Sequence, residues 1–255
     1  MFLAIDIGNS ETVCALCRGT TIIAQWRWQT VESRSGDEYG ALIGGLLTSH
    51  GHKLKEIKGV ILANVVPLSE GPMVDFCQRY LSVSPLVVSA RMKGLPELVL
   101  PRPEQAGGDR LANAVALQRD QGGASMAVDL GTATTFDVVD KHGRYIGGAI
   151  APGFAVSMAS LAQKAARLNE VSFQRETIAL IGDTTEDALR SGLYWGYVSM
   201  LEGMIARFRQ QQKSLKVVAC GGAAVMFAQQ KGLFDEYLPT LTLKGLAYLY
   251  QDNAP

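Results

Sequence analysis

One short phrase occurs twice in this chain: an apolar segment runs into Asp-x-Gly, and small hydroxyl or amide side chains follow. A second apolar segment comes after each copy, at residues 13–16 and 136–139. The aspartates and glycines of the two copies keep the same spacing, so a repeat of this kind predicts two similar half-domains. The copies are Leu3-Ala4-Ile5-Asp6-Ile7-Gly8-Asn9-Ser10 and Met126-Ala127-Val128-Asp129-Leu130-Gly131-Thr132-Ala133-Thr134-Thr135.

Length and charge narrow the class of protein. A chain of 255 residues can bury a large core, as one large domain or two small ones. Lys plus Arg and Asp plus Glu are equal at 24 each, which argues against a protein held to nucleic acid by phosphate neutralisation. Asp6 interrupts the first apolar run, so we expect neither a signal peptide nor a membrane span, and we expect a cytoplasmic protein.

Cys14 and Cys17 have the Cys-x-x-Cys spacing of a redox or zinc site. They lie in a strand-like run, however, where an odd spacing places two side chains on opposite faces of a sheet. Cys77 and Cys220 are isolated and the three histidines lack metal-site spacing, so no second pair completes four zinc ligands. We therefore expect reduced thiols.

The first half of the chain alternates strand and helix patterns. Residues 59–66 form a continuous apolar run, typical of a strand covered on both faces, and Pro67 ends it. Residues 37–50 have apolar side chains at helical spacing. This alternation predicts α/β layers with a partly parallel sheet. The other expected elements are a hairpin that turns at 18–20 and continues over 21–28, a helix over 72–81, a strand over 85–88, a loop over 94–103 and a helix over 109–119.

A Gly-rich turn at 121–125 precedes the second copy, and we place the boundary near it, with half-domains 1–118 and 119–255. The second half repeats the strand and hairpin pattern through 147–150. Helices are expected over 154–168 and 186–211, then a strand over 217–220 and another helix. The long helix has more large apolar residues than one buried face needs, and Gly192 and Gly196 would permit close approach of another helix. Core packing and a dimer seam both stay open for it.

Each Asp-x-Gly turn suits a phosphate ligand, although an ordinary turn is the alternative for either copy alone. Gly8 lets backbone N–H groups approach a ligand, and Asn9 and Ser10 can donate to phosphate oxygens. Asp6 repels phosphate, so it belongs beside a cation, and Mg²⁺ fits that arrangement. Two such turns facing each other would grip a polyphosphate from both sides. The second copy offers three hydroxyls, on Thr132, Thr134 and Thr135.

Gly107-Gly108-Asp109-Arg110 opens the helix expected over 109–119. Asp109 is either the N-cap of that helix or a general base that accepts a proton from a substrate hydroxyl. Arg110 would pair with a carboxylate or with phosphate charge. Gly221-Gly222, after a buried strand, would let a nucleotide base lie against the backbone, with a plain strand-to-helix turn as the alternative.

Together these phrases resemble the type III pantothenate kinases of the acetate and sugar kinase and actin-like ATPase superfamily. The resemblance covers nearly the whole chain, and the order and spacing of its motifs are highly specific. It implies two similar actin-like (ribonuclease H-like) half-domains, with mixed sheets flanked by helices and a cleft between them. The motifs are Asp6-Ile7-Gly8-Asn9, Asp37-Glu38-Tyr39-Gly40, Val65-Val66-Pro67, Gly107-Gly108-Asp109-Arg110, Asn113-Ala114, the run from Asp129 to Asp137, Gly147 to Gly153, Ser191-Gly192 and Gly221-Gly222.

The resemblance implies ATP-dependent phosphorylation of pantothenate to 4'-phosphopantothenate, the first step of coenzyme A biosynthesis, in a homodimer with a shared active site. Asp109 is similar to the family's general base, and Asp129 matches the residue that binds the activating K⁺ or NH₄⁺. The implied ATP-binding residues are Asp6, Ile7, Gly8, Asn9, Ser10, Glu11, Thr12, Val13 and Thr132. The implied pantothenate-binding residues are Leu100, Gly107, Gly108, Asp109, Arg110 and Thr185, with Thr184 as the alternative to Thr185.

Two departures from the family pattern stand out. Many members have Tyr-x-Asn-Pro before the Gly-x-Asp-Arg motif, whereas this chain has Leu100-Pro101-Arg102-Pro103, which lacks the Tyr hydroxyl. Ser10 replaces the usual Thr and keeps a hydroxyl. Two other functions stay open: a kinase for a different small hydroxy-acid, and a non-catalytic relative that binds nucleotide and regulates a partner.

Overall fold

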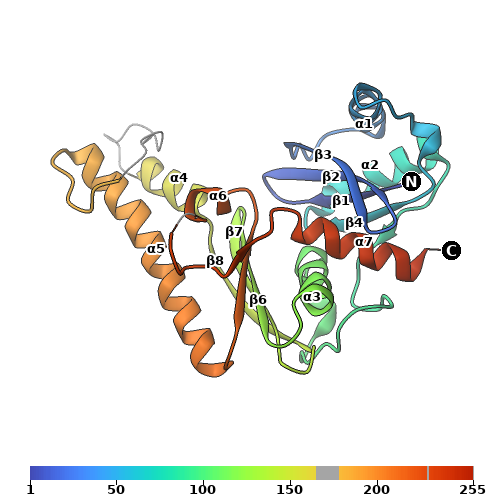
Figure 1. The fold of residues 1–255 in the computed structure, drawn as a ribbon. Coiled ribbons are helices and arrows are strands. Elements are labelled where there is room, and N and C mark those ends of the chain that lie inside the picture. Colours follow the sequence, from blue (N-terminus) through green and yellow to red (C-terminus); the bar gives the residue numbers. More distant parts are fainter. Residues whose placement is uncertain (165–177, 229, 255) are drawn as a thin grey trace. The chain divides into compact units, whose positions relative to one another are not determined.

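The computed structural model describes residues 1–164, 178–228 and 230–254. By their contacts, these residues form two compact units (Figure 1). Unit 1 covers residues 1–123, 137–147 and 240–255, and unit 2 covers 124–136 and 148–239. Unit 1 therefore combines the first part of the chain with two later segments.

Each copy of the repeat opens a five-stranded sheet, and the strands of the two sheets follow the same order. The orders are β3-β2-β1-β4-β5 and β8-β7-β6-β9-β10. In the first sheet, β1 pairs antiparallel with β2 and parallel with β4. In the second, β6 pairs parallel with β9 at the equivalent place. The matching order confirms the predicted repeat and the mixed sheets. The strands are β1 (Phe2–Ile7), β2 (Glu11–Arg18), β3 (Thr21–Gln29), β4 (Val60–Asn64), β5 (Leu86–Val87), β6 (Ser125–Leu130), β7 (Ala133–Val139), β8 (Tyr145–Pro152), β9 (Lys216–Cys220) and β10 (Glu236–Tyr237).

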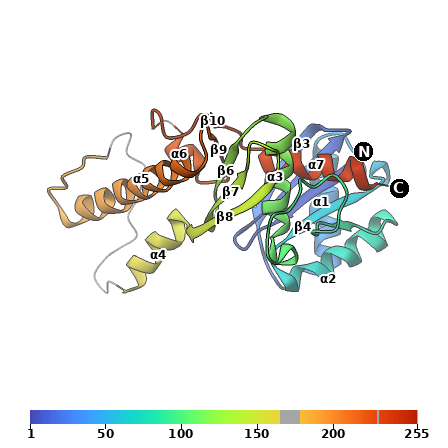
Figure 2. The same cartoon turned by 90° about the horizontal axis from the view of Figure 1, so that it is seen from below.

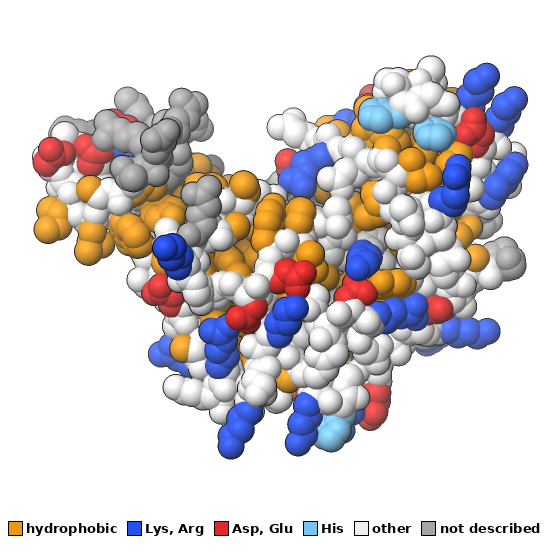
Figure 3. Space-filling model, viewed as in Figure 1, with side chains coloured by type: hydrophobic (Ala, Val, Ile, Leu, Met, Phe, Trp, Pro, Cys, Tyr) orange, Lys and Arg blue, Asp and Glu red, His pale blue; other side chains and the backbone are white. Residues whose placement is uncertain are grey.

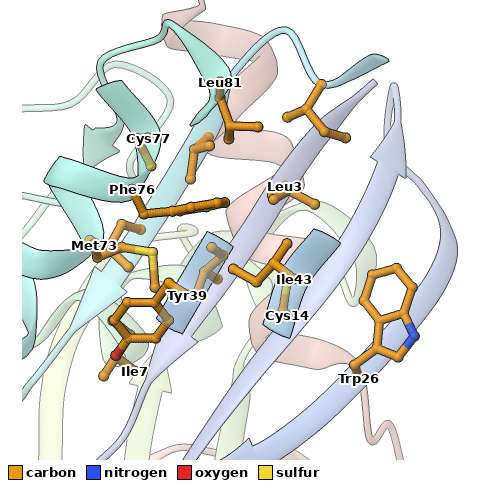
Figure 4. Close-up of a cluster of buried hydrophobic side chains, with 14 of the residues drawn as sticks. Leu3, Ile7, Cys14, Trp26, Tyr39, Ile43, Met73, Phe76, Cys77 and Leu81 are labelled. Atoms are coloured by element: carbon orange, nitrogen blue, oxygen red, sulfur yellow. The ribbon is translucent and has the colours of Figure 1, made fainter. Parts of the chain in front are cut away.

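Helices cover both faces of the first sheet. The helices α1 (Gly36–Ser49) and α2 (Pro67–Phe76) lie on one face, and α3 (Gly108–Asp120) and α7 (Leu241–Asn253) lie on the other (Figures 1 and 2). Successive residues of β1 enter opposite cores, as the strand period requires. Cys14 packs in the core under α1 and α2 (Figure 4), while Cys17 packs in the other. This confirms that the Cys-x-x-Cys pair is split between two faces.

The first turns of α1 and α2 show how local chemistry sets their starts. Ser35 caps α1 through a reciprocal capping box with Glu38. The helix α2 begins at Pro67, so the predicted start at residue 72 was wrong. Pro67 ends the strand pattern and also begins the helix, because its fixed φ and missing N–H suit a first helical position. A π-helical turn, Cys77–Leu81, follows α2, and short 3₁₀ turns lie at Leu54–Glu56 and Pro103–Gln105.

Unit 2 contains α4 (Phe154–Lys164), the long α5 (Thr185–Gln211) and the short α6 (Ala224–Phe227). Aromatic rings from all three helices meet: Phe154 and Tyr197 both pack edge-on or tilted against Phe227. The last residues of the helix predicted over 154–168 lie outside the described residues. Among the helices of the described ranges, none has the length and apolar character needed to cross a membrane.

Candidate functional site

Hydrogen bonds to its carbonyl groups hold the turn of the first copy, which lies between β1 and β2. The Gly8 N–H donates to the Glu11 carbonyl at 3.0 Å, and the Thr30 N–H donates to the Ser10 carbonyl at 2.9 Å. The Thr30 hydroxyl also donates to the Gly8 carbonyl at 2.7 Å and lies 2.9 Å from the buried hydroxyl of Thr12. Thr30, the residue after β3, therefore fixes two carbonyl groups of the predicted phosphate turn. Sequence reasoning missed this residue.

The turn of the second copy, between β6 and β7, is built in the same way. The Gly131 N–H donates to the Ala133 carbonyl at 3.0 Å, and the Gly153 N–H donates to the Thr132 carbonyl at 3.1 Å. Gly153 follows β8 as Thr30 follows β3. A Cβ at Gly153 would lie 2.3 Å from the carbonyl oxygens of Gly131 and Thr132, so the chain can pass here only as glycine. In both repeats, the residue after the third strand anchors the Asp-x-Gly turn.

The hydroxyls of the second copy are not all available to a ligand. Thr134 is fully buried, and its hydroxyl is hydrogen-bonded to that of Tyr197. The prediction that Thr134 holds phosphate was therefore wrong, because strand alternation turns its side chain into unit 2. Thr132 and Thr135 are half-buried.

Asp129 is the next-to-last residue of β6 and lies beside the Gly221-Gly222 loop. It pairs in register with Cys220 of β9, and Gly221 follows with a φ of +86°. A Cβ at Gly221 would lie 2.3 Å from the Asp129 Oδ1 atom. The glycine loop therefore packs directly against the carboxylate predicted to bind a cation. Within the described ranges, no cluster of three or more His, Cys, Asp or Glu side chains is placed to hold a metal ion.

Asp109 lies at the start of α3, but it is not the N-cap. That position belongs to Gly107, so the N-cap alternative was wrong. The half-buried Asp109 is the second residue of the helix, and its Oδ1 accepts the Arg110 N–H at 2.8 Å. A Cβ at Gly108 would lie 3.2–3.3 Å from Val88 and Ala63, so this glycine brings the start of α3 close to the first sheet. The positive end of the helix dipole there favours a carboxylate.

The side chain of Arg110 is anchored in the interior of unit 1. Its Nε donates to Asp137 Oδ1 at 2.7 Å, and the Tyr145 hydroxyl donates to the same oxygen at 2.7 Å. The Asp137 side chain is fully buried, whereas 18% of the Arg110 side chain is exposed. Burial, followed by the charge of Asp137, raises the pKa of Tyr145, so Tyr145 stays a neutral donor. Sequence reasoning quoted Asp137 as a motif residue but gave it no role.

The segment around Leu100 pairs with the start of β8. The Val99 N–H donates to the Tyr145 carbonyl, and the Tyr145 N–H donates to the Glu97 carbonyl, both at 2.9 Å. Gly147, with a φ of +92°, would place a Cβ 3.3 Å from a Leu100 methyl carbon. Five of the predicted pantothenate-binding residues thus lie in unit 1, namely Leu100, Gly107, Gly108, Asp109 and Arg110. Tyr145 contacts the partner of Arg110 through its hydroxyl and the segment before Leu100 through its backbone.

The sixth, Thr185, lies in unit 2 as the first residue of α5. Its neighbour Thr184 is the N-cap: the Thr184 hydroxyl accepts the Asp187 N–H at 3.1 Å and donates to the Asp187 carboxylate at 2.8 Å. Because capping engages the hydroxyl of Thr184, the exposed Thr185 is the better candidate of the two for contact with a substrate.

Solved structures of similar shape place the fold in the actin-like class. A protein from Campylobacter jejuni described as a Baf family transcriptional activator matches with a TM-score of 0.60 and 18% identity, covering 99% of this chain and 98% of its own. The ROK hexokinase from Thermus thermophilus matches with a TM-score of 0.52 and 12% identity over 97% of both chains. At these identities the likeness concerns the fold alone, and it confirms the predicted two-domain actin-like fold.

Sequence similarity gives the family. The family model described as type III pantothenate kinase matches residues 2–207. The type III pantothenate kinase of Zymomonas mobilis is 39% identical, over 100% of this chain and 94% of its own length. That of Paramagnetospirillum magneticum is 40% identical, over 100% and 98%. The chain belongs to the type III pantothenate kinase family, as its motifs predict.

Proposed function

We propose that this protein transfers the γ-phosphoryl group of ATP to the terminal hydroxyl of pantothenate and forms 4'-phosphopantothenate for coenzyme A biosynthesis. The observation that carries the proposal is the pair of Asp-x-Gly turns, each anchored through its carbonyl groups by the residue after a third strand. Because these carbonyl oxygens accept hydrogen bonds from within the protein, the turn is suited to bind phosphate oxygens. Membership of the type III pantothenate kinase family indicates that the acceptor is pantothenate.

The residues have separate roles in this proposal. ATP is contacted by Thr132 and by the segment Asp6 to Val13, in which the fully buried Ile7 and Thr12 contribute through their backbone. Asp109, at a helix N-terminus, accepts the proton of the acceptor hydroxyl as the new phosphorus–oxygen bond forms. Arg110 holds the carboxylate of pantothenate, and Leu100, Gly107, Gly108 and Thr185 complete its binding. Most of the rate enhancement comes from positioning and electrostatics, as is usual for phosphoryl transfer.

Two carboxylates suit the cations that such a reaction uses. Asp6 would hold Mg²⁺ or its water shell, and Asp129 would hold K⁺ or NH₄⁺. The donor set fits: each aspartate lies near the end of the first strand of a repeat, and Gly221 approaches Asp129 without bringing a side chain against its carboxylate. When bound, these cations offset the negative charge of the triphosphate. A homodimer with a shared active site and a cytoplasmic location belong to the same proposal.

The test is ADP release by the full chain with ATP, Mg²⁺ and pantothenate, with and without K⁺. We expect turnover that depends on both pantothenate and K⁺. A panel of other small hydroxy-acids in the same assay separates this function from a kinase with a different acceptor. Nucleotide binding without turnover on any acceptor, together with DNA retention at physiological salt, would instead indicate a regulatory relative.

A further inference from the structure

Arg110 is the predicted carboxylate-binding group, but its own geometry is set by another residue. Asp137 accepts the Arg110 Nε–H at 2.7 Å from a fully buried position at the core of unit 1. The Tyr145 hydroxyl, also buried, donates to the same Asp137 oxygen at 2.7 Å. Two donors on one oxygen fix the carboxylate, and the carboxylate in turn fixes the plane of the guanidinium.

This anchoring restricts how Arg110 can meet a ligand. An arginine has five N–H donors, and the one on Nε is directed at Asp137. A substrate carboxylate would therefore be met by the two terminal amino groups, Nη1 and Nη2, of a side chain that is 18% exposed. Arg110 follows Asp109 directly on the first turn of α3, so fixing its guanidinium also fixes the acceptor relative to the proposed base.

We propose that Asp137, with Tyr145, is a positioning residue for acceptor recognition: it holds Arg110 so that its terminal amino groups receive the carboxylate of pantothenate end-on. The inference rests on the proposed function. Tyr145 also pairs through its backbone with the segment that ends at Leu100, so the anchor joins the two parts of the proposed acceptor site that lie in unit 1.

The experiment compares two acceptors that differ only in charge: pantothenate, and pantothenate with its carboxylate converted to a primary amide. The measured quantity is the ratio of their kcat/KM values. In Asp137→Asn the preference for the carboxylate falls about tenfold or more, because a neutral amide holds the guanidinium less firmly than a charge-assisted ion pair does. Tyr145→Phe lowers this preference by a smaller factor, and Arg110→Met gives the lowest preference of the three variants.

A matched control is available next to the same strand. Asp140, just after β7, is also buried and accepts bonds from an arginine, Arg144, yet it has no place in the proposed site. Asp140→Asn leaves the preference unchanged. In the double variant Arg110→Met with Asp137→Asn, the second change has no further effect on the preference, because the group that Asp137 positions is gone.

An equal fall in kcat/KM for both acceptors in Asp137→Asn would show a merely structural role and overturn the inference. If that variant does not fold, Tyr145→Phe decides, because it keeps the ion pair and removes one donor; an unchanged preference there overturns the inference too. Failure of the proposed function looks different. In that case the unmodified protein does not use pantothenate at all, and the inference falls with it.

Discussion

At the scale of single residues, the proposed role of Asp109 as general base can be tested directly by substitution. In Asp109→Asn the amide oxygen can still accept the Arg110 N–H, so the start of α3 keeps its geometry. The variant loses only the ability to take a proton, and we expect kcat to fall by about 10²–10⁴-fold. ATP binding, measured by calorimetry, changes little. Near-normal turnover would remove Asp109 from the role of base.

The buried thiols give a prediction that depends on pH. Burial raises the pKa of Cys17 and of Cys77 to about 12, and it raises that of Cys14 as well. At pH 8 the folded protein therefore holds roughly one in 10,000 of the Cys17 or Cys77 side chains as the reactive thiolate. A chromogenic disulfide reagent reacts slowly with the native protein and with all four cysteines after guanidinium unfolding. Fast reaction of Cys17 in the native state would contradict this placement.

The same shift links the thiols to stability. The folded-state pKa values lie above those of the unfolded chain. Burial of the neutral thiols therefore makes its full contribution to the free energy of unfolding below the unfolded pKa of about 8.5. The contribution is lost as pH rises from there toward about 12, the folded value of Cys17 and Cys77.

The sequence reveals a site residue only when the signal for that residue is local. Asp109 and Arg110 are adjacent in a short motif, so the pattern itself displays them. Asp137 acts on Arg110 across 27 positions, and Thr30 acts on Gly8 across 22. Such contacts arise only when distant parts of the chain fold together, and an Asp in a strand or a Thr just after one gives no sign of its partner.

At the scale of elements, the repeat was predictable in outline because strand alternation and Asp-x-Gly spacing are local. The equivalence of Thr30 and Gly153 was not, since one is threonine and the other glycine. The shared feature is a backbone N–H, which donates to Ser10 in one repeat and to Thr132 in the other. Helix starts were harder to locate, as Pro67 shows, because the residue that ends an apolar strand pattern in the sequence is also the first residue of a helix.

Thr30 tests the anchor of the first turn. Thr30→Val keeps the shape of the side chain but removes the hydroxyl that donates to the Gly8 carbonyl and that is hydrogen-bonded to the Thr12 hydroxyl. Each such bond contributes about 0.5–1.5 kcal/mol, so we expect the KM for ATP to rise about tenfold or more with little change in the KM for pantothenate. Thr21→Val, at the other end of β3, is the control. Equal effects of the two substitutions would show that Thr30 contributes to the strand alone.

Gly221 tests the contact between the glycine loop and Asp129. Gly221→Ala places a Cβ 2.3 Å from the carboxylate oxygen and should displace it. We expect the K⁺ concentration for half-maximal activation to rise about tenfold or more, as for other changes behind a cation ligand. Gly232→Ala is the matched control, because Gly232 has a similar φ of +80° and a Cβ there would meet none of the described residues within 4 Å. Only the Gly221 variant should alter the K⁺ response; an unchanged response would separate Asp129 from the cation.

At the scale of the whole molecule, contacts within one chain do not account for the whole surface of α5. A Cβ added at Gly192 or Gly196 would meet no heavy atom of the described residues within 4 Å, apart from the helix's own backbone and the adjoining residues. Hydrophobic side chains gather at the surface of the part of unit 2 that contains α5 (Figure 3), and Leu180 and Ile181 just before it are 71% and 88% exposed. An apolar surface of this kind is typical of an interface, which supports the proposed homodimer.

Mixing two inactive variants tests the shared active site. Asp109→Asn removes the proposed base, and Thr185→Ala removes the contact proposed to come from the partner subunit. If each site uses Asp109 of one subunit and Thr185 of the other, a mixed dimer contains one site with both defects and one with neither. Equal mixing after exchange of subunits should then restore about a quarter of the unmodified activity, because half of the dimers are mixed and each has one intact site. Sedimentation of the mixture checks that dimers are present. Activity no higher than the mean of the two variants, with dimers confirmed, would place both residues in a site formed by one subunit.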